Sequence, residues 1–466
     1  MPAKKHPVPR NSNFPQESRV RTLHSPEASL PVCTYGELFP DGGIIELVQT
    51  AGILKLFVFD GKHGTIVPEA QFRGRLFRPP TLSQSIRRAM KFPAECINFG
   101  STRRLFAAIQ KLFVSNGFPE EAGLAATYFV FATWFPGALS MAPCLVITGP
   151  RLEACFLLQL LACLVRRPLP LAEVTRQSLC SLPMELKPTL IINAGRIGPT
   201  ALVLLRTSNH RNAFFSGKDG LVDLFCAKAV FCGDTIDTTI LAEGALHISL
   251  PPSWERLPIL DENSCEEVAQ EFQSKFLAYR CHHFLEVRES QFDVPEFTSP
   301  TRILARVFGS PIVHAPALQA GLIPLLKDHE ERQLELSWTD LRSVVLEAVL
   351  HHCHKEPGEW VHVGGMTGGI TKTVNGILKG RGDATKRDAR EIGPILRDLG
   401  LRSKRKSGGV MYLLDFAVCR QVHRLAHGSG LLAMRKGEAQ CQQCQSILNG
   451  TKVQDGHPSE SEKKHG

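Results

Sequence analysis

Basic side chains gather in one stretch of the chain, where they could neutralise the phosphates of a nucleic acid. From Lys372 to Lys406 there are eleven Lys or Arg residues and four Asp or Glu residues. The resulting excess of seven positive charges is most of the formal net charge of +9. Each cation that contacts a phosphate releases a counterion, so binding through such a cluster weakens steeply as salt is added. This stretch is the first candidate for a binding site.

The pattern around these cations predicts two helices. Apolar residues recur at helical spacing over 370–378, which indicates the first helix. Thr385 and Asp388 can open a second helix with an apolar stripe over 389–399. Gly400 is placed to end it, because glycine readily adopts the left-handed conformation that closes many helices.

A β-hairpin is expected after the second helix, from 401–405 and 410–414 around Ser407-Gly408-Gly409. Helix, helix and hairpin in this order predict a winged helix, whose second helix enters the major groove while the hairpin loop contacts the backbone. The residues expected to contact nucleic acid are Lys386, Arg387, Arg390 and Arg397 on the second helix and Arg402, Lys404, Arg405 and Lys406 on the hairpin. The alternative is a winged helix that contacts only proteins, with these cations forming a solvated face.

A second group of positions has the spacing of a phosphate-binding loop without its chemistry. A P-loop needs a strand, a glycine-rich turn, a lysine and a Ser or Thr that binds magnesium. A buried strand at 144–148 precedes Gly149, and the next buried strand, 189–193, ends in Asn193 where a carboxylate would hold magnesium. The positions of the second glycine, the lysine and the Ser or Thr are occupied by Ala154, Cys155 and Phe156. We therefore expect a degenerate, non-functional nucleotide site and assign no catalytic residue.

The surrounding elements predict an α/β fold. Strands at 144–148, 189–193, 227–232 and 246–250 alternate with helices such as 152–165, which favours a mainly parallel sheet covered on both faces. The expected domains are a disordered leader (1–30), a β-rich region (31–95), a P-loop-like core (96–255), a helical segment (256–335), the winged helix (336–432) and a polar tail (433–466).

The order of these features resembles phage- and plasmid-type helicase and primase-helicase proteins, which join an α/β ATPase core to a C-terminal winged helix. The resemblance covers 100–425 and rests on order and pattern, not on intact motifs. In that family the P-loop lysine and the carboxylate carry ATP hydrolysis, and both are replaced here. The resemblance thus implies an inactive relative that binds DNA in a mobile-element or replication-associated system. The alternatives are an active helicase or primase-helicase with a divergent nucleotide site, and a non-enzymatic protein-binding scaffold.

Cysteine and histidine residues near the C-terminal end could hold a metal only if they are brought together. Cys441 and Cys444 form a C-x-x-C pair, and His423 and His427 are four residues apart on an expected helix. Zinc requires four ligands, and no second C-x-x-C pair is present. The pattern therefore favours an incidental pair over a zinc site. The three histidines in 351–354 are expected to be solvated or to lie at the edge of the core. We expect no cofactor, and ATP with magnesium only if the core is active.

Composition describes a globular protein of several domains. The chain has 466 residues, of which 43% are hydrophobic and 21% charged. The 14 cysteines lie mostly in apolar runs, as expected for reduced core thiols. Residues 122–149 lack charge, but Pro136 and Pro143 split them into a buried helix, a loop and a strand rather than a membrane span. No secretory signal is visible, so we expect a cytoplasmic protein. The expected partner is DNA, and we expect no contact with a membrane.

Overall fold

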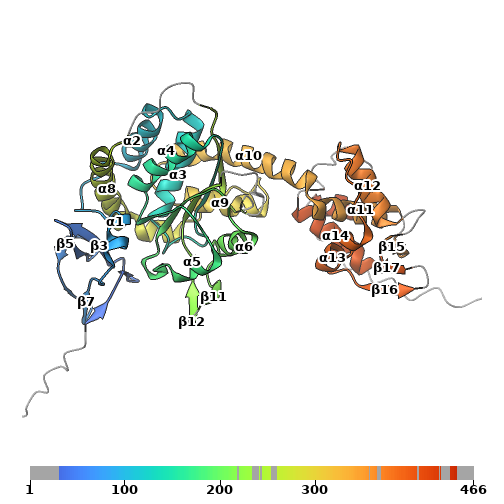
Figure 1. Cartoon of the computed structure of the whole chain (residues 1–466), viewed down its shortest axis with the longest axis horizontal. Coiled ribbons are helices and arrows are strands. Elements are labelled where there is room, and N and C mark those ends of the chain that lie inside the picture. Colours follow the sequence, from blue (N-terminus) through green and yellow to red (C-terminus); the bar gives the residue numbers. More distant parts are fainter. Residues whose placement is uncertain are drawn as a thin grey trace, which may run out of the picture.

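The computed structural model describes residues 31–217, 220–232, 241, 244–252, 260–355, 357–364, 369–406, 409–429, 431 and 441–448. The predicted leader and most of the predicted polar tail lie outside these ranges. Figure 1 shows N-terminal strands at one edge of an α/β body, and helix α10 (Pro316–Thr339) leading from that body to a C-terminal region.

A five-stranded parallel sheet forms the centre of the α/β body, which confirms the predicted mainly parallel sheet. Its strands lie in the order β14-β8-β13-β10-β9 and pair in parallel throughout. They are β8 (Cys144–Thr148), β9 (Pro168–Leu171), β10 (Thr189–Ala194), β13 (Lys228–Cys232) and β14 (Leu246–Ser249). The sequence pattern missed β9 because Pro168 and Pro170 argue against a strand. An edge strand tolerates proline, since one side of it donates no ladder hydrogen bonds.

Alternate side chains of the strands enter two different cores. Leu145 and Ile147 of β8 pack on one face, and Val146 packs on the other. The first face is covered by α2 (Thr102–Ser115), α3 (Glu120–Thr133), α4 (Arg151–Leu164) and α8 (Glu262–Glu289). The second is covered by α5 (Arg176–Ser181) and α6 (Pro199–Thr207). Burial on both faces explains why these strands read as continuous apolar runs.

The uncharged stretch at 122–149 contains α3, a short connection and β8, as predicted. Eleven of the fourteen α3 residues are buried, so the helix is apolar because it lies inside the body. Over the described residues, none of the helices combines the length and the hydropathy that a bilayer crossing requires.

The N-terminal region consists of two small sheets packed on the α/β body. One is antiparallel, in the order β2-β3-β4-β5, and the other has the order β1-β7-β6. Their strands are β1 (Val32–Cys33), β2 (Gly36–Leu38), β3 (Ile44–Thr50), β4 (Ile53–Phe59), β5 (Gly64–Val67), β6 (Ala70–Phe72) and β7 (Arg75–Arg78), followed by α1 (Gln84–Ala89). Side chains of β3 enter both cores of the body: Ile44 joins one and Ile45 the other. The region therefore shares its hydrophobic core with the body.

Smaller elements complete the body. The hairpin of β11 (Phe214–Gly217) and β12 (Gly220–Asp223) and the short helix η1 (Met184–Leu186) lie close together. Helix α9 (Ser299–Gly309) packs against α3 and α10.

The C-terminal region has its own hydrophobic core, distinct from the two cores of the body. Its elements are α11 (Leu341–Lys355), β15 (Trp360–His362), α12 (Ile370–Gly380), α13 (Ala389–Asp398), β16 (Ser403–Lys406), β17 (Gly409–Leu413), α14 (Phe416–Gly428) and α16 (Gln442–Leu448). The strands form an antiparallel sheet in the order β15-β17-β16. The predicted two helices and hairpin are present, and the three-residue strand β15 is an addition too short for a sequence pattern to reveal.

The ends of α13 follow the sequence signals. Asp388 caps the helix and exchanges side-chain and backbone hydrogen bonds with Glu391, which is a capping box. Gly400 has a φ of +79°, and the Leu401 amide donates to the Leu396 carbonyl at 3.1 Å. Both ends of the helix are thus set by neighbouring residues.

Candidate nucleic-acid interface and the position of the phosphate loop

Helix α13 presents two of the predicted arginines to solvent. Arg390 and Arg397 are exposed, seven residues apart on one face of the helix, with the exposed Pro394 between them. The opposite face buries Ile392 and Leu396 completely. The apolar side of the helix therefore fixes its orientation and directs the two guanidinium groups outward.

The sequence pattern had suggested that Lys386 and Arg387 lie on the second helix. In the structure both residues precede α13. The helix begins after the cap Asp388, and Asn375 of α12 holds the loop before it. The Asn375 side chain donates to the Arg387 carbonyl at 2.9 Å and accepts from the Arg387 amide at 2.8 Å. Arg387 also forms an ion pair with Glu391 at 3.4 Å, and this carboxylate partly neutralises its charge within the domain. Lys386 is exposed.

The hairpin carries the remaining predicted cations. Arg402, Lys404 and Arg405 are exposed, and β16 is an edge strand of its sheet. Lys404 and Arg405 are successive strand residues, so they project from opposite faces of the hairpin. Lys406 pairs with Gly409 through the backbone, and its side chain lies outside the described part of the structure.

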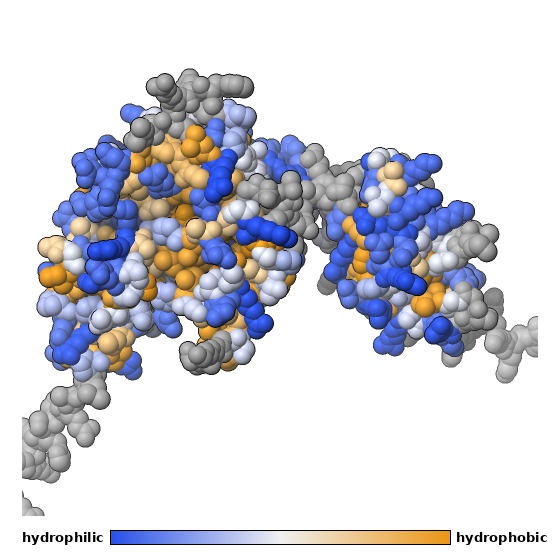
Figure 2. All heavy atoms as spheres, in the orientation of Figure 1, coloured by the Kyte–Doolittle hydropathy of each residue, from blue (hydrophilic) through white to orange (hydrophobic). Residues whose placement is uncertain are grey.

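Tyr412 connects the hairpin to α13. Its side chain is 1% exposed, its strand position is opposite Ser403, and its hydroxyl donates to the Gly393 carbonyl at 3.5 Å. Burial raises the pKa of Tyr412, whereas the charge of the nearby Arg397 acts to lower it. The helix and the hairpin are thus packed as neighbours, and hydrophilic residues cover much of the visible face of this region (Figure 2).

The structure removes part of the charge that the sequence had counted. Arg381 turns inward and forms an ion pair with Glu347, with side chains only 7% and 4% exposed. Glu391 and Asp398 are exposed on α13 and balance its two arginines. Within the described ranges, Arg390, Arg397 and the three hairpin cations form no ion pair. The positive surface therefore comes from the hairpin and the flanking loop more than from the helix.

At the phosphate-loop position, the chain turns from strand to helix within two residues. β8 ends at Thr148, Gly149 and Pro150 make the turn, and α4 begins at Arg151. Gly149 has a φ of +127°, and a Cβ atom there would lie 2.4 Å from the Leu250 carbonyl oxygen, so only glycine fits. The turn is too short to wrap a phosphate.

The three positions after the turn are built into the helix and the core. The Ala154 amide donates to the Pro150 carbonyl at 3.1 Å, and the Ala154 side chain is fully buried. Phe156 stacks on Phe118 with ring centroids 5.6 Å apart. The Cys155 thiol accepts a hydrogen bond from the Asn193 amide at 3.1 Å. The positions of a P-loop lysine and a magnesium carboxylate are therefore adjacent in space, but neither side chain carries a charge that phosphoryl transfer could use.

A histidine and arginine group beside this turn was not found from the sequence. The Thr148 hydroxyl lies 3.1 Å from His247 Nε2, and Arg332 Nη1 of α10 lies 2.5 Å from His247 Nδ1. Burial, with a contribution from Arg332, lowers the pKa of His247 to about 4, and the same causes act on His329 with the same result. Both imidazoles are neutral at pH 7. His247 is 99 residues from Thr148 and 85 residues from Arg332, so no local pattern links them.

Three arginines surround one glutamate at the junction of β3 with the body. Arg166 Nη2 lies 2.8 Å from the carboxylate of Glu46, and Arg167 and Arg280 also pair with it. All four residues are 5% exposed or less. Burial alone would raise the pKa of Glu46, but the three arginines lower it to about 2. They line a cavity of about 400 Å³ on the side where β9 and β10 begin, opposite the turn at Gly149.

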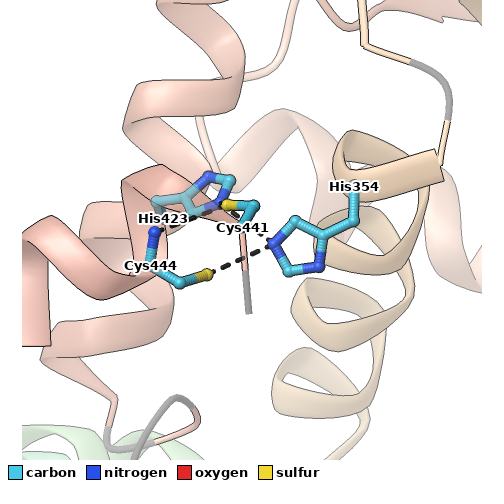
Figure 3. Close-up of side chains that lie close together, drawn as sticks. All are labelled: His354, His423, Cys441 and Cys444. Atoms are coloured by element: carbon cyan, nitrogen blue, oxygen red, sulfur yellow. Dashed lines mark hydrogen bonds between the residues drawn. The ribbon is translucent and has the colours of Figure 1, made fainter. Parts of the chain in front are cut away.

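Histidine and cysteine side chains meet in the C-terminal region (Figure 3). Cys441 and Cys444 lie with His423 of α14 and His354 of α11, whereas His427 is exposed and outside the group. The sequence suggested His423 and His427 as partners. His354 takes the place of His427 because α11 packs against α14. Part of the predicted tail is therefore a helix, α16, packed on α14.

Comparisons with known proteins place this chain in no family. No family model matches it, and no curated protein matches it. Two solved structures are apo forms of the C-terminal region of NrS-1, with 10% and 9% sequence identity. They cover 80% and 79% of this chain and 96% of their own chains, with TM-scores of 0.31 and 0.28. Scores this low support no argument about fold or function.

Proposed function

We propose that this protein binds DNA through a winged helix formed by 341–428, and that its α/β body is a P-loop ATPase fold that does not hydrolyse ATP. Such a protein would serve a mobile-element or replication-associated system as an inactive relative of helicases. In the C-terminal region, α13 is the recognition helix and the hairpin of β16 and β17 is the wing. The sheet order β15-β17-β16, with a first helix before β15, supports this assignment.

The observation that carries the proposal is the placement of exposed cations on two neighbouring elements. Arg390 and Arg397 face outward from α13, and Lys404 and Arg405 face outward from the hairpin. A helix in the major groove with a hairpin on the adjacent backbone needs cations in these two places. A surface used only for protein contacts has no such requirement.

The body supports the second part of the proposal. Its five-stranded parallel sheet, with β8 inside it between β14 and β13, fits the α/β ATPase core that the sequence resembles. In such a core, Cys155 and Asn193 stand where lysine and a carboxylate would act, and they contact each other at 3.1 Å. The helix begins directly after the turn at Gly149, and its Ala154 amide is committed to the Pro150 carbonyl. The proposed body therefore has the fold of an ATPase but does not hydrolyse ATP.

The test is a titration of labelled duplex DNA with the full chain. Fluorescence anisotropy measures the affinity over a range of salt concentrations. We expect R390Q/R397Q/K404Q/R405Q to weaken binding to a duplex on the order of 100-fold and to lower the salt slope by about 2, because Lys404 and Arg405 would contact phosphates. A matched control is R87Q/R88Q/R103Q/R104Q, which removes four exposed cations from α1 and α2 of the body. Equal losses for the two variants, or a salt-independent affinity, would contradict the proposal.

A further inference from the structure

Four potential metal ligands converge where three helices of the C-terminal region meet. His354 lies in the last turn of α11, His423 on α14, and Cys441 and Cys444 at the start of α16. Their ligand atoms all lie within 4.8 Å of one another, and Figure 3 shows the two imidazoles and two thiols directed toward a common point. His354 and Cys444 are separated by 90 residues in the sequence.

The distances between these atoms suit a tetrahedral ion. His423 Nε2 lies 3.0 Å from His354 Nε2 and 2.9 Å from Cys441 Sγ, and Cys444 Sγ lies 3.2 Å from His354 Nε2. Tetrahedral zinc, with bonds of about 2.0–2.1 Å to nitrogen and about 2.3 Å to sulfur, requires edges of about 3.3 to 3.8 Å. Lengthening these three distances by about 0.3 to 0.7 Å would accommodate the ion.

Hydrogen bonds around the group orient its donor atoms. His423 Nδ1 lies 2.7 Å from the Cys419 carbonyl, which can only accept, so Nδ1 carries the proton in this hydrogen bond. The lone pair of His423 Nε2 then faces the group, which is the arrangement usual for a metal-ligating histidine. The Cys444 amide donates to Cys441 Sγ at 3.4 Å and can support a thiolate there.

We propose that His354, His423, Cys441 and Cys444 bind one zinc ion. Two thiolates and two imidazoles form a complete tetrahedral set, so the ion has no open position and the site is structural, not catalytic. Loading the site releases the two thiol protons to solvent and involves no change of oxidation state. The ion joins α16 to α11 and α14, and so stabilises the packing of α16 on the domain that carries the exposed cations.

Access to the site is compatible with loading after folding. Cys444 is fully buried and His423 is 2% exposed, whereas His354 is exposed and Cys441 is half-buried. The ion would enter from the side of His354. Cysteine thiolates with imidazoles favour zinc over magnesium or calcium, which prefer oxygen ligands.

The test measures metal in the purified full chain, without nucleic acid, so that it is independent of the DNA-binding proposal. We expect one zinc per chain by elemental analysis, and a visible spectrum with tetrahedral bands and a thiolate-to-cobalt band after exchange with Co²⁺. H423A and C441S/C444S should each reduce the zinc content more than tenfold. The matched controls are H427A, one turn further on α14, and H351A on α11, which should keep the metal because both residues are exposed and outside the group.

A conservative variant separates metal binding from folding. H423C should retain one zinc and strengthen the thiolate-to-cobalt band, because a third thiolate replaces the imidazole. Loss of zinc from H427A to the same extent as from H423A would overturn the proposal. Retention of zinc by C441S/C444S, or the lack of a tetrahedral cobalt spectrum in the unaltered chain, would overturn it as well.

Discussion

Three arginines of the α/β body point inward, whereas two arginines of the C-terminal region point outward. In the body, Arg166, Arg167 and Arg280 are almost completely buried around Glu46, and their guanidinium groups also donate to backbone carbonyls. In the C-terminal region, Arg390 and Arg397 are exposed and form no ion pair among the described residues. The same residue type therefore holds the fold together in one region and is available to a partner in the other.

This difference separates two roles of a cation, stabilising the fold and attracting a polyanion, which the net charge alone does not distinguish. Removing the partner of a buried cation leaves an uncompensated charge in a medium that solvates it poorly, so folding suffers. Removing an exposed cation leaves the fold almost unchanged and weakens only the attraction for a polyanion. Substitutions in the two regions should have opposite consequences for stability and for binding.

The largest effect is expected from Glu46→Gln. The change leaves three buried guanidinium groups without their shared carboxylate, and we expect the free energy of unfolding of the body to fall by about 3–5 kcal/mol. Chemical denaturation measures it. Glu69→Gln is the control, because Glu69 pairs with Arg78 at the surface, with side chains 44% and 48% exposed, and should cost at most about 1 kcal/mol. Similar losses for both variants would remove the contrast between the regions.

The next prediction compares the cations of the hairpin with those of α13 in the C-terminal region. We expect R402Q/K404Q/R405Q to weaken binding to all duplex sequences by about 30- to 100-fold, because these hairpin cations would contact the backbone. R390Q/R397Q should instead change the preference among sequences, since α13 is the proposed recognition helix. Both variants should keep the free energy of unfolding within about 0.5 kcal/mol of the unaltered chain. A uniform loss from the α13 variant would argue against base contacts by this helix.

Acid is expected to destabilise the body. The pKa values of His247 and His329 are lowered to about 4 in the folded body, whereas an unfolded histidine titrates near 6.5. The unfolded state thus binds protons first, so stability is highest above pH 6.5 and falls as the pH drops toward 4. We expect each histidine to contribute a loss of about 2 kcal/mol between pH 7 and pH 5. H247Q/H329Q should flatten this dependence, and an unchanged profile in that variant would assign the loss to other groups.

The smallest effect is expected at the phosphate-loop position. C155K/N193D restores the two charges of an ATPase, but the two-residue turn and the helical amide of Ala154 remain. We therefore expect no ATP binding by calorimetry and no phosphate release, with or without DNA, in this variant or in the unaltered chain. DNA-stimulated phosphate release from the unaltered chain would support the active-helicase alternative.

Local patterns predicted much of the fold. The strands β8, β10, β13 and β14 appeared as short apolar runs because both faces of the sheet are buried. The ends of α13 lie at Asp388 and Gly400 as predicted, because capping acts within a few residues, whereas Thr385 precedes the helix. The same patterns misplaced Lys386 and Arg387, because the Asn375 side chain that holds this loop comes from another helix.

The sequence by itself determined most of the elements, the residue types at the predicted phosphate-loop positions and the excess of positive charge, since each depends on residues close together along the chain. Only the tertiary structure decided which charges stay available: Arg381 is buried against Glu347, and Arg390 is exposed. It also brought His354 to Cys441 and Cys444 across almost a hundred residues. A side chain's partner is set by the packing of distant helices and strands, and spacing in the sequence carries no record of that packing.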